Sequence, residues 1–468
     1  MGCCCCLCSL LLLVSAFLGL LCVPQVQQQM NRLRYQNIEN APVATVLYIV
    51  DLVSNTVQCS PKLLEGNIEW LTCVKNKVAL SGPEVLGWEA GAVMGRNFKG
   101  EVAPWVYSHA AYRTIVYDPS ARRTPHHLSQ CNTSSTWPQG LDALLVNMHT
   151  GDPDWAARRK LFFDALPALH LDGSGHGMDA VVPKGVRPRD GKSKRKVNDV
   201  VGATLFRFLF DIDVEAELAE MFWYDETIGP CIVTTIPPGS DKVSRMTKLR
   251  DEVLFNKVLA SSVGRGFMEL AQERGMDGTM KLKEILWIVL FAAYGGTSNV
   301  VHDTLSFALK DADRQADIFR ENPTAYMLEG ARLFPAVAGM NPWMVKEGVE
   351  GILGGKLKLP DGSPVAAEAG AYGFMLTSGA NRDPTVFPEP AEFRPGRPEA
   401  ERLLTFNNEL QDVRKCADAS TAGCPAAPRP CLGTWLAVRV AKAALAFFLS
   451  DYGSAATKSK GAGKTGEL

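Results

Sequence analysis

The sequence RPCLGTWLAVRVAKAALAFF, from Arg429 to Phe448, decides the fold. Its cysteine, Cys431, lies directly before an apolar helical pattern. A helix that begins just after a cysteine directs its amide groups and the positive end of its dipole at the sulfur, which favours the thiolate. Gly433 lets the backbone turn close to a flat macrocycle, and Arg429 is placed to pair with an anion. The pattern therefore predicts a thiolate metal-ligand loop, although a buried structural cysteine is the commoner meaning of R-x-C-x-G alone.

Two charged patterns lie upstream of this loop. The segment Glu329–Arg332 places a carboxylate and a guanidinium three residues apart on one helix face. The segment Phe393–Arg397 adds a second arginine. We expect Glu329, Arg332 and Arg397 to form a buried ion network that holds the cysteine loop. The alternative is a surface pair, the usual occurrence of E-x-x-R.

A third pattern lies earlier in the chain, where Asp154 to Leu169 has the apolar spacing of a helix. Trp155 and Arg159 are one helical turn apart, so both can point at one anionic group. The alternative is an amphipathic helix with one tryptophan in the core.

The longest apolar helical pattern after the N-terminal stretch runs from Leu282 to Leu309, with AAYGGTSN (Ala292–Asn299) at its centre. Two adjacent glycines inside a helix cost ~1 kcal/mol each relative to alanine. That cost indicates that a ligand or another backbone approaches closely there. The alternative is that the helix breaks at Gly295.

In this order the four elements resemble the cytochrome P-450 family, over roughly residues 144–448. The resemblance implies a mainly α fold with small β-sheets, in a single large domain. It also implies haem b, with Cys431 as the proximal ligand of the iron. The residues that it places around the haem are Trp155, Arg159, Arg429, Cys431 and Gly433, with Arg159 and Arg429 on the propionates. Glu329, Arg332 and Arg397 form the family's structural cluster.

One departure from the family concerns the reaction. An acidic residue usually precedes Thr297 and helps to deliver protons in dioxygen chemistry, whereas this chain has Gly296 there. The segment Ala293–Gly296 and a lengthened ligand loop with Asn407-Asn408 are similar to the allene oxide synthases and hydroperoxide lyases. That branch rearranges fatty-acid hydroperoxides without O2, reductase or NADPH.

The resemblance to this branch implies catalytic positions at Cys431, Thr297, Gly296 and Ala292. The branch's catalytic asparagine corresponds to Ala292, which is a mismatch. We predict a haem-thiolate enzyme that rearranges or cleaves fatty-acid hydroperoxides in oxylipin metabolism, with a lipophilic small molecule as substrate. The alternatives are a monooxygenase of a lipophilic substrate, which would need a redox partner, and a haem-binding relative without catalysis.

The N-terminal stretch Cys3 to Val23 carries no charge and reaches the ~20 residues that a bilayer-spanning helix needs. We predict an anchor or a cleaved signal at residues 1–26, a linker at 27–37, the haem domain at 38–455 and a disordered tail at 456–468. Arg32 and Arg34 follow the stretch, so the positive-inside rule places the haem domain in the cytosol. The expected location is the endoplasmic reticulum membrane, with the plastid as the alternative.

Composition adds three expectations. The net charge of −1 does not suggest a nucleic-acid partner. The seven cysteines after the N-terminal stretch form no zinc motif and no disulfide framework, so we expect most of them to be buried reduced thiols. The basic segment Lys184 to Lys196 is expected to be a solvated loop, with contact to anionic lipid as the alternative.

Overall fold

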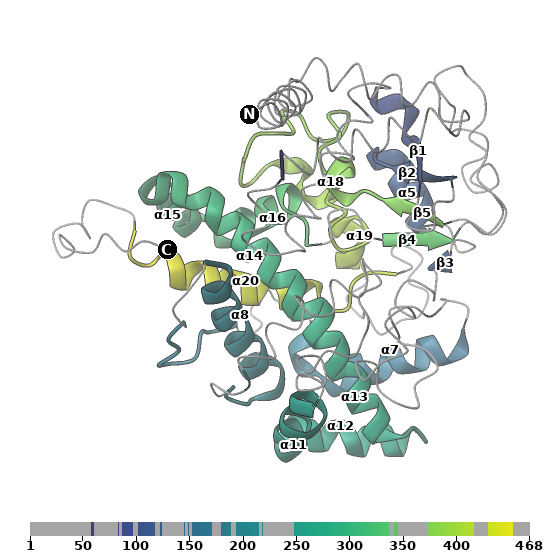
Figure 1. Cartoon of the computed structure of the whole chain (residues 1–468), viewed down its shortest axis with the longest axis vertical. Helices are drawn as coiled ribbons and strands as arrows, with labels where there is room; N and C mark the ends of the chain where they lie inside the picture. Colours follow the sequence, from purple (N-terminus) through teal and green to yellow (C-terminus); the bar gives the residue numbers. More distant parts are fainter. Residues whose placement is uncertain are drawn as a thin grey trace, which may run out of the picture. The chain divides into compact units, whose positions relative to one another are not determined.

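The computed structural model describes part of the chain (Figure 1). The described residues are 58–59, 83, 87–96, 102–117, 122–123, 145, 148, 152–170, 179–188, 193–214, 218, 248–336, 341–344, 372–415 and 429–452. All of them lie inside the predicted domain 38–455. The predicted anchor or signal at 1–26, the linker at 27–37 and the tail at 456–468 lie outside the described residues.

The chain divides into two compact units. One unit comprises Met1–Ile115 and Ala338–Thr385, and the other comprises Val116–Val337 and Val386–Leu468. Every residue of the candidate site belongs to the second unit.

The first unit is built around a small sheet in which four strands have the order β1-β2-β5-β4. Strands β1 (Ala92–Arg96) and β2 (Val102–Val106) pair antiparallel, as do β4 (Asn341–Met344) and β5 (Tyr372–Met375). Strand β2 pairs with β5 in parallel.

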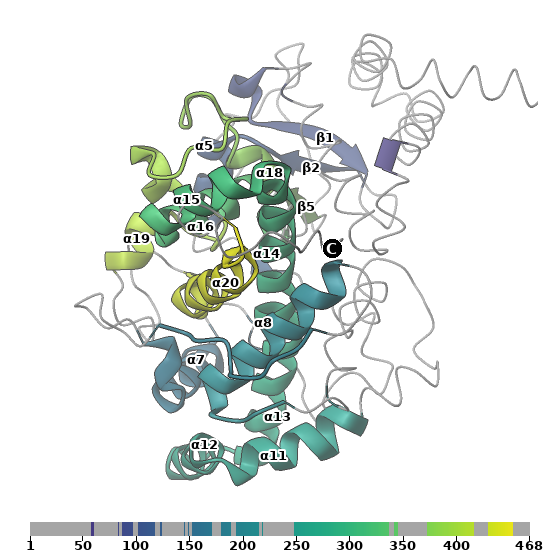
Figure 2. The same cartoon turned by 90° about the vertical axis from the view of Figure 1, so that its left-hand side faces the viewer.

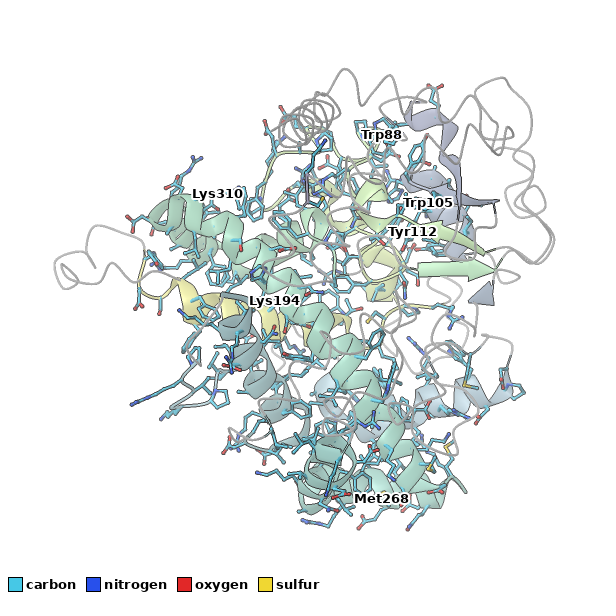
Figure 3. The ribbon with its side chains drawn as sticks, viewed as in Figure 1. Trp88, Trp105, Tyr112, Lys194, Met268 and Lys310 are labelled. Atoms are coloured by element: carbon cyan, nitrogen blue, oxygen red, sulfur yellow. The ribbon has the colours of Figure 1, made fainter. Side chains whose placement is uncertain are left out.

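Short helices complete this unit, namely η1 (Trp88–Ala90), α18 (Thr377–Ala380) and most of α5 (His109–Tyr117). The Tyr107 hydroxyl donates a hydrogen bond to the Gly87 carbonyl over 2.8 Å. The His109 amide donates to the Asp383 carboxylate over 2.9 Å. Trp105 and Tyr112, labelled in Figure 3, are both buried among these elements.

The second unit is mainly helical. Its elements in chain order are β3 (Arg122–Arg123), α7 (Pro153–Ala165), η3 (Pro167–Leu169), α8 (Ser193–Phe210), η5 (Leu249–Leu254), α11 (Phe255–Ala260), α12 (Ser262–Glu273), α13 (Gly278–Ile288), η6 (Val289–Tyr294), α14 (Gly295–Ala308), η7 (Leu309–Asp311), α15 (Ala312–Glu321), α16 (Pro323–Leu333), η8 (Pro398–Arg402), α19 (Leu410–Lys415) and α20 (Thr434–Leu449).

One continuous helical run, formed by α13, η6 and α14, organises this unit. Helix α14 packs against α8, α16 and α20, and α20 packs against α8 and α16 in turn. Figure 2 shows α20, in yellow, beside α14 with α8 below it. The prediction of one long helix from Leu282 to Leu309 is confirmed. The run from Gly278 to Glu321 is long and apolar enough to cross a membrane, but 67% of its apolar window is buried inside the protein. Burial of this kind is typical of a core helix.

Helix α8 contains the end of the basic segment. It begins at Ser193, inside the segment that was expected to be a solvated loop, so that expectation is wrong for the end of the segment. Lys194 is 5% exposed and donates a hydrogen bond to the Asn299 side chain of α14 (Figure 3). The helix ends at Phe210, where Asp211 takes the left-handed conformation at φ 54°.

The cysteines show one departure from expectation. Cys59 is buried but disulfide-bonded, whereas Cys431 is a thiol. A single bond needs no regular cysteine spacing, which is why the sequence carries no signal for it.

The close approach of α14 and α16 generates a first prediction. A Cβ atom added at Gly330 would lie 2.4 Å from Thr304 Oγ1. We expect Gly330→Ala to lower the free energy of unfolding by about 1–3 kcal/mol, because the two helices must move apart. Chemical denaturation measures the change.

Gly266→Ala is the matched control, since this glycine is also helical and has nothing within 4 Å of the added Cβ. We expect it to be neutral or to stabilise the protein by up to ~1 kcal/mol. Equal effects of the two substitutions would contradict the packing explanation.

Candidate functional site

Cys431 lies at the N-terminal end of α20 and is half-buried. Its amide donates to the Phe406 carbonyl over 3.1 Å, which ties the cysteine to an earlier part of the ligand loop. Its carbonyl accepts from the Thr434 hydroxyl over 2.8 Å. These contacts fix the backbone of the cysteine at both its amide and its carbonyl. The dipole of the helix that begins at Thr434 favours the thiolate form of the sulfur.

Gly433 lies beside the sulfur of Cys431 and has no special backbone conformation. It is the N-cap of α20 with φ −91°, a value open to any residue. A Cβ atom added there would lie 4.0 Å from Cys431 Sγ. The glycine therefore leaves that flank of the sulfur open.

Two guanidinium groups converge on Trp155. The Cζ atoms of Arg159 and Arg429 lie 5.4 Å and 5.5 Å from the centre of its ring. The side chain of Trp155 is 2% exposed, and the two arginines are 5% and 8% exposed. Two buried cations on one aromatic ring form an environment suited to an anionic group.

Backbone carbonyls hold both guanidinium groups. Arg159 Nη2 donates to the Pro430 carbonyl over 2.7 Å, and Arg429 Nη2 donates to the Met148 carbonyl over 2.8 Å. Pro430 directly precedes the cysteine, so α7 is tied to the ligand loop through Arg159. Burial lowers the pKa of Arg159 to about 10, and the charge of Cys431 acts in the opposite direction. Arg159 is therefore still a cation at neutral pH, close to the sulfur.

The segment before the cysteine contains the asparagine pair singled out in the sequence. Asn407 has φ 75°, a left-handed conformation that asparagine tolerates. Its Nδ2 donates to the Arg429 carbonyl over 3.5 Å. Asn408 is fully buried, and neither atom of its side-chain amide finds a hydrogen-bond partner within the described part of the chain.

The structure brings Glu329, Arg332 and Arg397 together in one buried cluster. Arg332 donates to both carboxylate oxygens of Glu329 over 2.9 Å and 2.8 Å. Arg397 Nε lies 3.0 Å and 3.1 Å from the same two oxygens. The amide of Arg394 adds a further donor at 2.9 Å. These donors satisfy the hydrogen-bonding capacity of a carboxylate that is buried in the interior.

This cluster connects to the ligand loop through one hydroxyl group. Thr405 Oγ1 donates to the Ala331 carbonyl over 2.7 Å, and Thr405 directly precedes the Phe406 that accepts from the Cys431 amide. Helix α16 is thereby joined to the start of the cysteine loop.

The central helix has a distortion in front of its glycine pair. η6 is a π-helical segment that ends at Tyr294, and Gly295 continues the helix with φ −60° and ψ −46°. The alternative that the helix breaks at Gly295 is therefore wrong. A Cβ atom added at Gly296 would meet Ala336 Cβ at 3.4 Å, an ordinary contact. No tight backbone approach within the described residues explains this glycine, and π-helical segments of this kind occur often at functional sites.

The remaining candidate positions differ in burial. Thr297 is 5% exposed and Ala292 is exposed. His302 is 3% exposed, and its Nδ1 lies 3.1 Å from the Asp303 carboxylate, so it is a packed histidine.

The residues that the sequence did not reveal act mainly through their backbones. The carbonyls of Met148 and Pro430 hold the two arginines, and any residue type supplies a carbonyl. Glu284 and Thr405 contribute side chains, but neither belongs to a motif. Only the folded chain brings them to the site.

Comparisons with solved structures identify the fold. No protein-family model matches the sequence, and no curated protein matches it. P450BioI, in complex with hexadec-9Z-enoic acid ligated acyl carrier protein, resembles this chain with a TM-score of 0.51 and 16% identity, over 80% of this chain and 92% of that chain. Epothilone D-bound cytochrome P450epoK has a TM-score of 0.50 and 16% identity, over 76% and 85% of the two chains.

CYP105D6 is similar to the same degree, with a TM-score of 0.50 and 16% identity, over 77% of this chain and 84% of that chain. The protein therefore has the cytochrome P450 fold. The predicted fold class, mainly α with small β-sheets, is confirmed.

The buried charge of Arg159 generates a second prediction. We expect Arg159→Met to raise the free energy of unfolding of the haem-free protein by about 1–3 kcal/mol at pH 7, because it removes a desolvated cation. Burial lowers the pKa of Arg159 in the folded protein to about 10, below its ordinary value in an unfolded chain. The penalty is therefore complete at pH values well below 10 and fades as the pH rises through and above 10, so the gain should shrink there.

Denaturant unfolding of both proteins from pH 7 to pH 11 measures this gain. Arg439→Met on α20 is the control, because Arg439 is partly exposed. A variant that is less stable than the wild type at pH 7 would contradict the account of the buried charge.

Proposed function

We propose that the chain is a haem-thiolate enzyme in which Cys431 is the axial ligand of the iron of haem b. The observation that carries the proposal is the placement of two buried guanidinium groups on Trp155, beside a thiol at a helix N-terminus. The donor set fits this group, since the thiolate is a ligand for iron and the two cations suit the two propionates. Arg159, Arg429 and Trp155 would hold the propionates, and Gly433 would leave room for the ring beside the sulfur.

When bound, haem with a thiolate ligand supplies the chemistry that cleaves oxygen–oxygen bonds. Residues of the chain would position the haem ligand and form the walls of the site. Arg159 and the α20 dipole would favour the thiolate form of Cys431. The Glu329–Arg332–Arg397 cluster holds the ligand loop through Thr405. Thr297 and Gly296 lie on the helix that would form the distal wall.

We propose a fatty-acid hydroperoxide as the substrate, rearranged or cleaved without O2 or NADPH. Gly296 supports this reaction, because glycine cannot relay a proton and a hydroperoxide brings its own oxygen–oxygen bond. The complex of P450BioI with hexadec-9Z-enoic acid ligated acyl carrier protein, a protein of the same fold, supports the proposal of a lipid substrate. Ala292, at the position of the branch's asparagine, lacks a polar side chain for the reaction.

The second candidate function is a monooxygenase of a lipophilic substrate that receives electrons from a redox partner. The uncharged stretch Cys3 to Val23 favours it, because an anchor of this kind suits an enzyme of the endoplasmic reticulum membrane. Attachment to that membrane, or to a plastid membrane, is part of the proposal and depends on residues outside the described range.

The ligand assignment gives a third prediction. We expect Cys431→Ser to abolish the thiolate-type optical spectrum of the ferrous carbonyl complex, because a hydroxyl group stays protonated and binds iron weakly. Absorption spectra of the haem-loaded proteins measure this. Cys424→Ser, at the nearest cysteine in the sequence, should leave the spectrum unchanged. An unchanged spectrum in Cys431→Ser would show that another group binds the iron.

The reaction gives a fourth prediction. Haem-loaded protein mixed anaerobically with a fatty-acid hydroperoxide, without reductase or NADPH, should consume it, seen as loss of the conjugated-diene absorbance. Haem-free protein is the control. If the haem-loaded protein leaves the hydroperoxide intact, the rearrangement proposal fails. Substrate-dependent NADPH consumption with a reductase would then indicate the monooxygenase, and inactivity in both assays would indicate a non-catalytic relative.

A further inference from the structure

Glu284 is a fully buried carboxylate in α13, the helix that leads into η6 and α14. Its Oε1 accepts from the Leu145 amide over 2.8 Å. Arg158 Nη1 lies 3.3 Å from each carboxylate oxygen, and Lys281 Nζ lies 3.4 Å from Oε2. One carboxylate therefore joins α13, which carries Glu284 and Lys281, to Arg158 of α7 and to Leu145.

The first connection leads from Glu284 to Arg429. The Leu145 amide is held by Glu284, and the Leu145 carbonyl accepts from the Met148 amide over 3.3 Å. The Met148 carbonyl accepts from Arg429 Nη2 over 2.8 Å. Hydrogen bonds thus run from the central helix through Leu145 and Met148 to the arginine beside the cysteine.

The second connection leads from Glu284 to Arg159. Arg158 and Arg159 are consecutive in α7, so their side chains project about 100° apart around the helix axis. Arg158 is held by Glu284 and by an ion pair with Asp154 on its own helix. Fixing Arg158 fixes the rotation of α7, and Arg159 then reaches the Pro430 carbonyl.

A purely stabilising role accounts poorly for this arrangement. Replacing a buried ion pair by apolar residues of similar volume is often neutral or stabilising, so such a pair is weak evidence for stability. A carboxylate in this position does fix the geometry of two otherwise independent contacts, those of Glu284 with the Leu145 amide and with Arg158. Both connections end at the guanidinium groups on Trp155.

We propose that Glu284 is a positioning residue that sets the two guanidinium groups of Arg159 and Arg429 for the propionates of haem. The inference rests on the proposed function, because haem is the anion that these groups would bind. By this inference the central helix would not only form the distal wall but also position Arg159 and Arg429 through intermediate residues.

Glu284→Gln is the test variant, because it keeps the shape and an acceptor for the Leu145 amide and removes the charge that holds Arg158. We expect it to weaken haem affinity by about 10- to 100-fold, the range usual for residues that orient the direct ligands of a site. We also expect a smaller share of the thiolate-type spectrum in the ferrous carbonyl complex. Titration of haem-free protein with haem gives both readouts.

The double variant Glu284→Gln/Arg159→Lys separates positioning from general damage. If Glu284 acts through the arginines, its effect on haem affinity should be much smaller when Arg159 is already replaced, because coupled residues are not additive. Asp383→Asn is the matched control, since Asp383 is a carboxylate 1% exposed that accepts a backbone amide in the other unit. It should leave haem affinity unchanged.

The outcomes are distinct. Unchanged haem affinity in Glu284→Gln, or strictly additive effects in the double variant, would overturn the inference while the proposed function stands. Wild-type protein that binds no haem would overturn the proposed function and this inference with it. Thermal unfolding of each haem-free variant shows whether it is folded. If Glu284→Gln does not fold, Arg158→Met, which cuts only the connection through α7, must give the same loss of affinity.

Discussion

The arrangement of the helical unit depends on keeping two guanidinium charges inside the protein beside a thiol. Buried cations are costly unless they are fixed by hydrogen bonds and matched by an anion. The backbone carbonyls of Pro430 and Met148 fix Arg159 and Arg429, and both guanidinium groups lie against the ring of Trp155. An anionic ligand would offset the remaining free-energy cost of burying the two cations. That gain would add to the affinity of the site for the ligand.

Two buried carboxylates support this arrangement from different sides. Glu329 binds Arg332 and Arg397 and is joined through Thr405 to the start of the cysteine loop. Glu284 accepts from the Leu145 amide and from Arg158, and through these contacts it is connected to Arg429 and Arg159. Each carboxylate has several donors, so each defines a geometry more strictly than apolar packing would. The cysteine and the arginines are therefore positioned by separate networks.

The central helix is continuous but contains one π-helical segment. Its π-helical segment ends just before the glycine pair, and Gly296 makes only an ordinary contact with Ala336. Gly296 has no group that could relay a proton, and the helix around it keeps its continuity. The proposed hydroperoxide substrate, which carries its own oxygen–oxygen bond, would suit this combination, and Ala292 would offer it no polar side chain.

The sequence by itself determined the fold class, the long helix from Leu282 to Leu309 and the grouping of Glu329, Arg332 and Arg397. These depend on local periodicity and on spacing within motifs, which the linear chain displays. Only the tertiary structure decided the burial of Lys194, the disulfide at Cys59 and the connections of Glu284, Met148 and Thr405. The contacts of Lys194, Glu284, Met148 and Thr405 join residues more than a hundred positions apart or use backbone carbonyls, and neither leaves a pattern in the order of the residues.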